Sequence, residues 1–288
     1  MKTVTSSAPG KLMLLGEHAV VYGYPCLVAA VNKGITVKIS KSPDKQVIPD
    51  SVYVKAAVRK FFAKYQVKSS ISISTTSDIL PTWGLGSSAA VTVAALNALS
   101  KFFAISLSAP QLFDLAFSVV RSIHRKSSGF DVAAAVYGGT IYYQKDKFIK
   151  KLPAKNMPLL TVYSGIKADT AKMVEKVAEL RKNHSQKVES VFFQIGKLVN
   201  KGKLAYQKSD WDALGNLFNL SQEKLVELGV STPIIDKLID SARQNSALGA
   251  KLSGAGGGDC IIMLYKPAKK QILIDAMTAN GGQILDVL

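Results

Sequence analysis

The stretch GLGSSAAVTVAALNAL, residues 84–99, restricts the fold of this chain more than any other feature. Its last eleven residues contain no Gly or Pro and are rich in Ala, Val and Leu, so they predict a largely buried helix. Two glycines and two serines come directly before that helix: Gly84, Gly86, Ser87 and Ser88. Glycine permits backbone dihedrals and close approaches that other residues do not, and a helix N-terminus presents N–H groups to an anion such as phosphate. A tight turn with a serine cap explains the same residues equally well, so the rest of the chain must decide.

The remaining pattern mixes strands and helices in irregular order. Alternating apolar and polar side chains predict half-buried strands at 35–40 and 71–75, and further strands are expected at 140–144 and 283–288. LLTVYSG at 159–165 is expected to be the boundary region between the two halves of the chain. Helices are predicted at 52–65, 108–123, 170–182, 185–205, 211–228, 233–245 and 267–279. Because strands and helices do not alternate regularly, the order favours an α+β fold. A lysine-rich turn containing Pro153 and Pro158 divides the chain, so we expect two domains, residues 1–156 and 157–288.

The helix predicted at 108–123 has the clearest start signal in the chain. Ser108 is placed to cap it, Pro110 stands in its first turn, and Gln111 completes a capping box. The apolar positions after this start form one stripe at helical spacing: Leu112, Leu115, Ala116, Val119 and Val120. This segment therefore predicts an amphipathic helix with one buried face.

Composition and charge narrow the function classes. Hydrophobic residues make up 48% of the 288 residues and charged residues 20%, as in an ordinary globular protein. The two cysteines lack metal-ligand spacing, no apolar run is long enough to cross a membrane, and the N-terminus lacks a signal-peptide core, so we expect a cytoplasmic protein without membrane contact. A net charge of +17 would attract polyanions, but the lysines are spread along the chain and no nucleic-acid module appears. We therefore expect no nucleic-acid partner.

Four clusters of glycine and polar residues could carry chemistry. They are APGKLMLLGEHAVVYG at 8–23, GLGSS at 84–88, HRKSSGFDVAAAVYGG at 124–139 and KLSGAGGGDC at 251–260. Taken singly, each has a structural explanation: Lys11 could be a surface lysine and Asp131 a helix cap. Taken together, two glycine-rich loops, a lysine and an isolated aspartate are the parts that a phosphoryl-transfer enzyme needs. Neither loop has the P-loop or the dinucleotide-binding pattern.

These segments resemble the motifs of the GHMP small-molecule kinases over nearly the whole chain. APGKLMLLGEHAVVYG is similar to the first motif of the family in its mevalonate kinase form, GLGSSAA to the second and KLSGAGGGDC to the third. SGIKADT at 164–170 and ELGVSTPIIDKLI at 227–239 are also similar to mevalonate kinase segments. His18 supports this branch, since phosphomevalonate kinases usually carry Tyr there. The resemblance implies an N-terminal domain like domain 2 of ribosomal protein S5 and a ferredoxin-like C-terminal domain.

The resemblance also implies how ATP and Mg²⁺ are bound. The phosphates of ATP would lie over the second motif, whose residues are Gly84, Leu85, Gly86, Ser87, Ser88 and Ala89. Ser88 would coordinate Mg²⁺. Asp131 would accept or orient the proton of the substrate hydroxyl, and Lys11 would stabilise charge on the transferred phosphoryl group.

For the acceptor, the resemblance implies phosphorylation of the 5-hydroxyl of mevalonate. Glu17 and His18 would bind this small molecule together with Lys11 and Asp131. The third motif would add four substrate-binding residues: Ser253, Gly254, Ala255 and Gly256. The resemblance is also compatible with a homodimer.

Two departures from the mevalonate kinase pattern leave the acceptor substrate open, with phosphomevalonate kinase as the alternative. SSGFDVAAAVYGG around Asp131 and Asp259 in the third motif both look more like phosphomevalonate kinase. A helical glutamate that binds Mg²⁺ in many family members aligns with Val120, which would leave Mg²⁺ to a serine hydroxyl, phosphate oxygens and water. Basic residues near Asp131 are candidates for contacts to a substrate phosphate, although a solvated basic surface is the simpler explanation: Arg121, Arg125 and Lys126.

Overall fold

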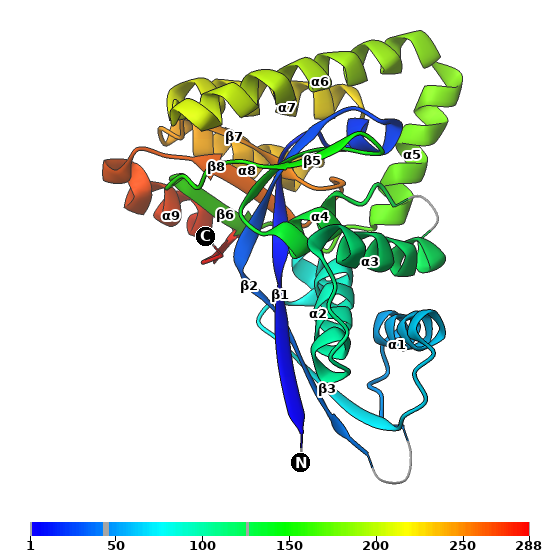
Figure 1. Cartoon of the computed structure of the whole chain (residues 1–288). Coiled ribbons are helices and arrows are strands. Elements are labelled where there is room, and N and C mark those ends of the chain that lie inside the picture. The colour runs from blue at the N-terminus through cyan, green and yellow to red at the C-terminus, as the bar shows by residue number, and fades with distance from the viewer. Residues whose placement is uncertain (1, 43–45, 125–126, 288) are drawn as a thin grey trace. The chain divides into compact units, whose positions relative to one another are not determined.

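The computed structural model describes residues 2–42, 46–124 and 127–287, and the chain divides into two compact units. Unit 1 comprises residues 1–11, 30–81 and 85–139, and unit 2 comprises residues 12–29, 82–84 and 140–288. Strands β1 (Thr3–Leu15) and β2 (Cys26–Lys41), both labelled in Figure 1, are long. Each contributes residues to both units. The observed mixture of helices and sheets confirms the predicted α+β class.

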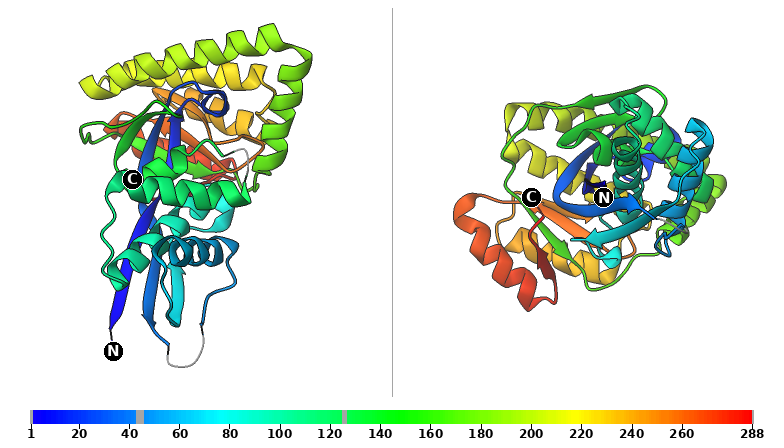
Figure 2. Two further views of the ribbon diagram at one scale, coloured as in Figure 1. Left: turned by 45° about the vertical axis from the view of Figure 1, so that its right-hand side comes forward. Right: turned by 60° about the horizontal axis from the view of Figure 1, so that its bottom comes forward.

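Unit 1 is built on parts of β1 and β2, which are neighbours in a sheet, on β3 and on a layer of helices. Strand β3 (Ile71–Ser77) pairs antiparallel with the unit 1 part of β2, from Ile35 opposite Ser77 to Lys41 opposite Ile71. The helices of this unit are α1 (Val52–Tyr65), α2 (Ser87–Phe102), α3 (Ala109–Ile123) and α4 (Phe130–Tyr137). Helix α2 contacts the other three, because its many alanines let neighbouring helices approach closely (Figure 2).

Two predicted features of unit 1 are confirmed residue by residue. Ser108 and Gln111 form the capping box at the start of α3. The buried face of α3 consists of the five apolar residues of the predicted stripe, Val120 included. The glycine-rich loop does lead into a buried helix, which begins at Ser87 and is longer than the apolar run alone indicated.

Unit 2 contains two groups of strands and most of the helices. The first residues of β2 pair with β4 (Thr140–Gln144), which pairs with β5 (Phe148–Lys151). A separate antiparallel sheet has the order β7-β8-β6-β9, formed by Gly249–Ser253, Cys260–Leu264, Leu159–Tyr163 and Gln283–Leu285. Its helices are α5 (Thr170–Asn183), α6 (Ser185–Lys208), α7 (Trp211–Glu227), α8 (Pro233–Gln244) and α9 (Lys270–Ala279), with α6 and α7 side by side in Figure 1.

Each compact unit consists of several separate segments of the chain, which strand pairing brings together, so no single position divides the sequence into the two units. Cys26 lies opposite Tyr143, so residues 12–29 and 140–156 both belong to unit 2, whereas the sequence pattern placed them in the N-terminal domain. The segment expected as a lysine-rich turn contains β5, whose side chains are not buried. In the part of the chain that the structure describes, no helix is long and apolar enough to cross a membrane.

Candidate active site

The glycine-rich loop ends in a helix start that has no side-chain cap. Gly86 is the N-cap residue of α2 and has a φ of 75°, a left-handed conformation that suits glycine. Because glycine has no side chain, Gly86 cannot accept hydrogen bonds from the first backbone N–H groups of α2, which begin at Ser87. Of the six predicted ATP-binding residues, Gly84 belongs to unit 2 and residues 85–89 belong to unit 1.

Lys11 lies against this loop within unit 1. Its backbone N–H donates a hydrogen bond to the Leu85 carbonyl at 2.8 Å. Its side chain is buried and covers Gly86, where an added Cβ would lie 3.0 Å from the Lys11 Cγ. The Lys11 Nζ is 5.7 Å from the centre of the Phe130 ring, at the start of α4. The predicted catalytic lysine is therefore a buried residue of β1 that packs against the loop, and not a surface lysine.

Asp131 is half-buried in the first turn of α4, directly after Phe130. The turn before it reverses at Gly129, whose φ is 91°. The pKa of Tyr53 in α1 is raised mainly by burial. A hydrogen bond with the Ser88 side chain acts to lower this pKa, and the charge of Asp131 acts to raise it. Unit 1 thus brings together Lys11, Ser88 and Asp131 around a few neighbouring side chains.

Tyr53 and His124 are a feature of unit 1 that sequence analysis missed. The Tyr53 hydroxyl is hydrogen-bonded to Nε2 of His124, and their ring centres are 5.9 Å apart. His124 follows the last residue of α3, and its backbone N–H donates to the Val120 carbonyl at 2.8 Å. Nothing in the sequence marks a tyrosine in the first turn of a predicted helix as part of a functional site, since only the tertiary fold brings α1 to Ser88.

The departures noted around Asp131 have different structural outcomes. Val120 is 3% exposed on the apolar face of α3, so it belongs to the core. Arg121 is exposed, and its guanidinium lies 5.5 Å from the centre of the Phe117 ring. Arg125 and Lys126 lie outside the described residues. Over residues 2–42, 46–124 and 127–287, no group of three or more His, Cys, Asp or Glu side chains gathers as a metal site would require.

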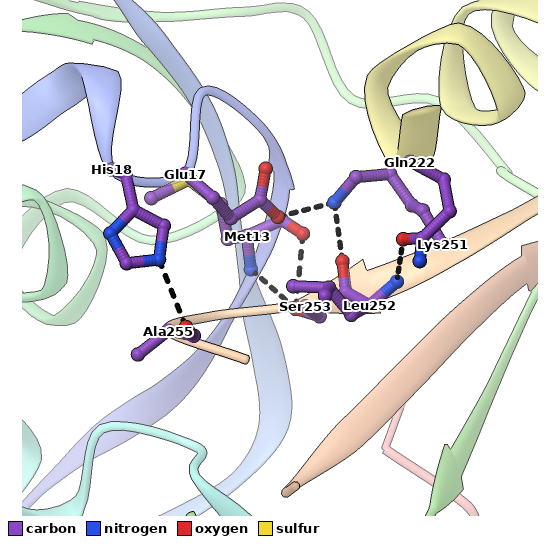
Figure 3. Close-up of polar contacts among 8 residues, drawn as sticks. All are labelled: Met13, Glu17, His18, Gln222, Lys251, Leu252, Ser253 and Ala255. Carbon is purple, nitrogen blue, oxygen red and sulfur yellow. Dashed lines mark hydrogen bonds and ion pairs between the residues drawn. The ribbon is translucent and has the colours of Figure 1, made fainter. Parts of the chain in front are cut away.

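In unit 2, Glu17 forms a buried ion pair with Lys251. The two side chains are 1% and 0% exposed, and Lys251 Nζ donates to Glu17 Oε1 (Figure 3). Burial raises the pKa of Glu17, while the charge of Lys251 and its hydrogen bond act in the opposite direction. Burial likewise lowers the pKa of Lys251 against the effect of Glu17. Each charge is therefore maintained in the interior by the other.

His18 is buried beside Glu17 and contacts the third motif. Its Nε2–H donates to the Ala255 carbonyl at 2.9 Å, which assigns the proton to that nitrogen (Figure 3). Burial lowers the pKa of His18, and the hydrogen bond to Ala255 opposes this effect. The backbone of His18 has a φ of 58°, so a residue other than glycine adopts a positive φ in the turn after Gly16.

The third motif is held by backbone contacts on both sides. The Ser253 hydroxyl donates to the Met13 carbonyl and accepts from the Met13 N–H, each at 3.0 Å. The glycines that follow have positive φ angles from Gly254 to Gly258, and a Cβ on Gly256 would lie 2.2 Å from the Val230 carbonyl oxygen. Unit 2 therefore joins Glu17, His18 and the predicted residues 253–256 in one cluster.

Asp259 is a structural residue of this motif. Its carboxylate accepts a hydrogen bond from the Ala168 N–H, and its side chain packs on Gly84, where an added Cβ would lie 2.3 Å from Oδ2. Cys260, which follows it, is buried and donates from Sγ to the Trp83 carbonyl. The replacement of a family glycine by Asp259 is thus explained by contacts within unit 2.

Comparisons with known proteins show the family to which the chain belongs. The family model described as "GHMP kinases N terminal domain" matches residues 52–139, and "GHMP kinases C terminal" matches residues 203–283. A "Galactokinase galactose-binding signature" matches residues 2–41. A mevalonate kinase of Thermococcus gammatolerans is 33% identical, and the alignment covers 97% of this chain and 94% of the relative.

Solved structures share the fold. The crystal structure of L. major mevalonate kinase in complex with R-mevalonate has a TM-score of 0.84 and 26% identity, covering 98% of this chain and 94% of the other. Streptococcus pneumoniae phosphomevalonate kinase in complex with phosphomevalonate and AMPPNP has a TM-score of 0.86 at 19% identity, with 100% of both chains covered. At that identity, the second likeness shows the fold alone.

Proposed function

We propose that this chain, which belongs to the mevalonate kinase family of the GHMP kinases, transfers the terminal phosphoryl group of ATP to the 5-hydroxyl of mevalonate. Membership of that family makes the chain an ATP-dependent phosphotransferase that acts on an alcohol. The observation that best supports the proposed acceptor is the buried cluster of Glu17, His18 and Ser253, built from the first and third motifs.

For phosphoryl transfer, we assign the unit 1 residues around α2 and α4. The glycine-rich loop and the start of α2 would bind the phosphates through backbone N–H groups and the positive end of the helix dipole. Lys11 would stabilise the negative charge of the transferred group, a task suited to a buried ammonium next to the loop. Asp131 would orient the acceptor hydroxyl and receive its proton.

The residues present are compatible with Mg²⁺, provided that most of its ligands are not protein groups. Ser88 is the proposed protein ligand, Val120 is apolar and buried, and Mg²⁺ commonly keeps several waters. When bound, Mg²⁺ would neutralise charge on the phosphate oxygens. We expect Ser88→Ala to weaken the binding of Mg·ATP, measured by calorimetry, relative to ATP in excess chelator; equal weakening of both would argue against a metal ligand at Ser88.

For acceptor binding, we assign the unit 2 cluster. Glu17 offers a carboxylate oxygen that is not engaged with Lys251, and carboxylates accept hydrogen bonds from hydroxyl groups. Residues 253–256 would bind the acceptor through backbone groups, since Gly254 and Gly256 carry no side chains. His18 would fix this loop through Ala255.

Phosphomevalonate kinase remains the second candidate, favoured by the sequence around Asp131. The structure weakens one of its supports, because Asp259 is explained by folding contacts. A coupled assay of ADP release, with mevalonate and 5-phosphomevalonate offered separately, tests the proposal. We expect turnover with mevalonate; turnover with 5-phosphomevalonate alone would assign the second function, and turnover with neither would reject both.

A further inference from the structure

Lys251 is a buried charge that the proposed reaction does not yet use. Its side chain is fully buried on β7, and Nζ donates to Glu17 Oε1 and to the Leu252 carbonyl (Figure 3). Nζ also lies 5.9 Å from the centre of the Phe218 ring of α7. An ammonium group in such a place is costly unless it is paired, and replacing the whole pair by apolar residues is often neutral or stabilising. Stability alone therefore does not explain why the pair is present.

One oxygen of the Glu17 carboxylate makes no hydrogen bond of standard geometry within the described part of the chain, although the backbone N–H groups of Glu17 and Gly254 lower the pKa of this carboxyl group. Oε2 is buried and has no hydrogen-bond partner of standard geometry among the described residues. The neighbouring polar atoms of the cluster are engaged elsewhere: the Ser253 hydroxyl with Met13, and His18 Nε2 with Ala255. A buried acceptor without a donor is energetically unfavourable, so the oxygen is a candidate to receive a hydrogen bond from a bound ligand.

We propose that Lys251 is a positioning residue for the acceptor substrate: it turns Oε1 of Glu17 toward its own Nζ and leaves Oε2 to accept a hydrogen bond from a substrate hydroxyl. This inference rests on the proposed function, because it assumes that the Glu17 cluster binds the alcohol. It assigns Lys251 an effect on the acceptor through Glu17 and no contact with the acceptor itself.

The electrostatics of the pair support this role. Burial raises the pKa of Glu17, and the charge of Lys251 is the largest opposing influence, followed by its hydrogen bond. Without Lys251, burial is opposed only by the backbone N–H groups of Glu17 and Gly254, so a larger share of the carboxyl groups would be protonated. A protonated and unanchored carboxyl group is a poorer acceptor for a hydroxyl.

Steady-state kinetics of a small set of variants test the proposal. The set is Lys251→Met, Glu17→Gln, the double variant, and Lys266→Met as a matched control, since Lys266 is an exposed lysine 3.6 Å from Asp212. We expect Lys251→Met to raise KM for mevalonate by about tenfold or more, as when a site loses a hydrogen bond to a substrate hydroxyl, with KM for ATP changed less than about twofold. The control should leave both KM values unchanged.

The double variant identifies whether Lys251 acts through Glu17. In the Glu17→Gln background, adding Lys251→Met should leave KM for mevalonate unchanged, because the group that Lys251 positions is already altered. A further rise would mean that Lys251 contacts the substrate directly, and an unchanged KM in the single Lys251→Met variant would mean that it does not position the site; either result overturns the proposal. Should Lys251→Met alone not fold, the comparison of Glu17→Gln with the double variant carries the test.

Failure of the proposed function gives a different result. If the wild-type chain does not turn over mevalonate, the acceptor assignment fails before any variant is compared. If the wild type turns over mevalonate and Lys251→Met shows the wild-type KM, only the positioning role fails.

Discussion

The carboxylate of Asp259 accepts a hydrogen bond from the backbone N–H of Ala168 at 2.9 Å, and this contact fastens the end of the third motif to the 164–168 segment. The backbone of Asp259 adds two bonds, donating to the Ile166 carbonyl at 2.7 Å and accepting from the Ser164 N–H at 2.8 Å. SGIKADT, which resembled a mevalonate kinase segment, therefore serves in part to hold the glycine-rich loop. The residues that carry this resemblance are therefore also residues that hold the third motif in place.

Replacing Asp259 should destabilise unit 2 in a graded way. Asp259→Ala removes a charge-assisted hydrogen bond to a buried N–H and should lower the free energy of unfolding by about 1–3 kcal/mol. Asp259→Gly should cost less, because the φ of 57° at this position favours glycine. Chemical denaturation measures both, with the exposed Asp240→Ala on α8 as the control, expected within about 0.5 kcal/mol of wild type. If Asp259→Ala and Asp259→Gly lowered the free energy of unfolding equally, the positive φ of this position would not contribute to the difference.

Gly84 should not tolerate a side chain while Asp259 is present. A Cβ at Gly84 would lie 2.3 Å from Oδ2 and 2.8 Å from Cβ of Asp259, and its φ of 69° adds about 1–2 kcal/mol of strain for alanine. Gly84→Ala should therefore lower the melting temperature, and Asp259→Gly in the same protein should recover part of the loss. The comparison is made against Gly23→Ala, where φ is 85° and no atom lies within 4 Å of the added Cβ. If Gly84→Ala lowered the melting temperature no more than Gly23→Ala, backbone strain alone would explain the loss and the contact with Asp259 would not contribute to it.

The features that could be predicted from the sequence are those that depend on residues close together in the chain. The capping box at Ser108 and the apolar stripe of α3 depend on residues three or four positions apart, and both appear as predicted. The glycine-rich motifs could be recognised because a positive φ or a close approach restricts the choice of residue, as at Gly86 and Gly256.

Features that depend on distant pairing could not be read in the same way. Lys251 stands in a recognised motif, yet its partner Glu17 is 234 positions away, and only the pairing shows that both are buried. Tyr53 reaches Ser88 and His124 through the packing of α1 on α2 and α3. The assignment of residues 12–29 to unit 2 likewise follows from the register of β2 with β4.

His18 should make folding stability depend on pH in the acidic direction. Its pKa in the folded chain lies below the usual 6.5 because burial penalises the imidazolium form. The unfolded chain therefore binds a proton near pH 6.5 that the folded chain does not, so stability is complete above that pH and falls as the pH decreases toward the folded pKa, by at most about 1.4 kcal/mol per pH unit. His18→Asn, chosen because asparagine adopts a positive φ more readily than most residues, should show a shallower loss between about pH 6.5 and 5.5. Glu17 titrates in both proteins, so the difference between the two curves isolates His18, and parallel curves would refute the assignment.

Asp131 and Lys11 should affect turnover far more than folding. Asp131 is half-buried at a helix start and Lys11 lies along the loop, so Asp131→Asn and Lys11→Met keep the shape and most of the packing of each side chain. Each should lower kcat by about 10²-fold or more, because a proton acceptor or a charge near the transferred group is lost. Thermal unfolding checks that the variants are folded, and calorimetry checks that Asp131→Asn still binds ATP. A folded Asp131→Asn protein with near wild-type kcat would remove this carboxylate from the reaction, and positioning by Lys11 and the loop would then have to account for catalysis.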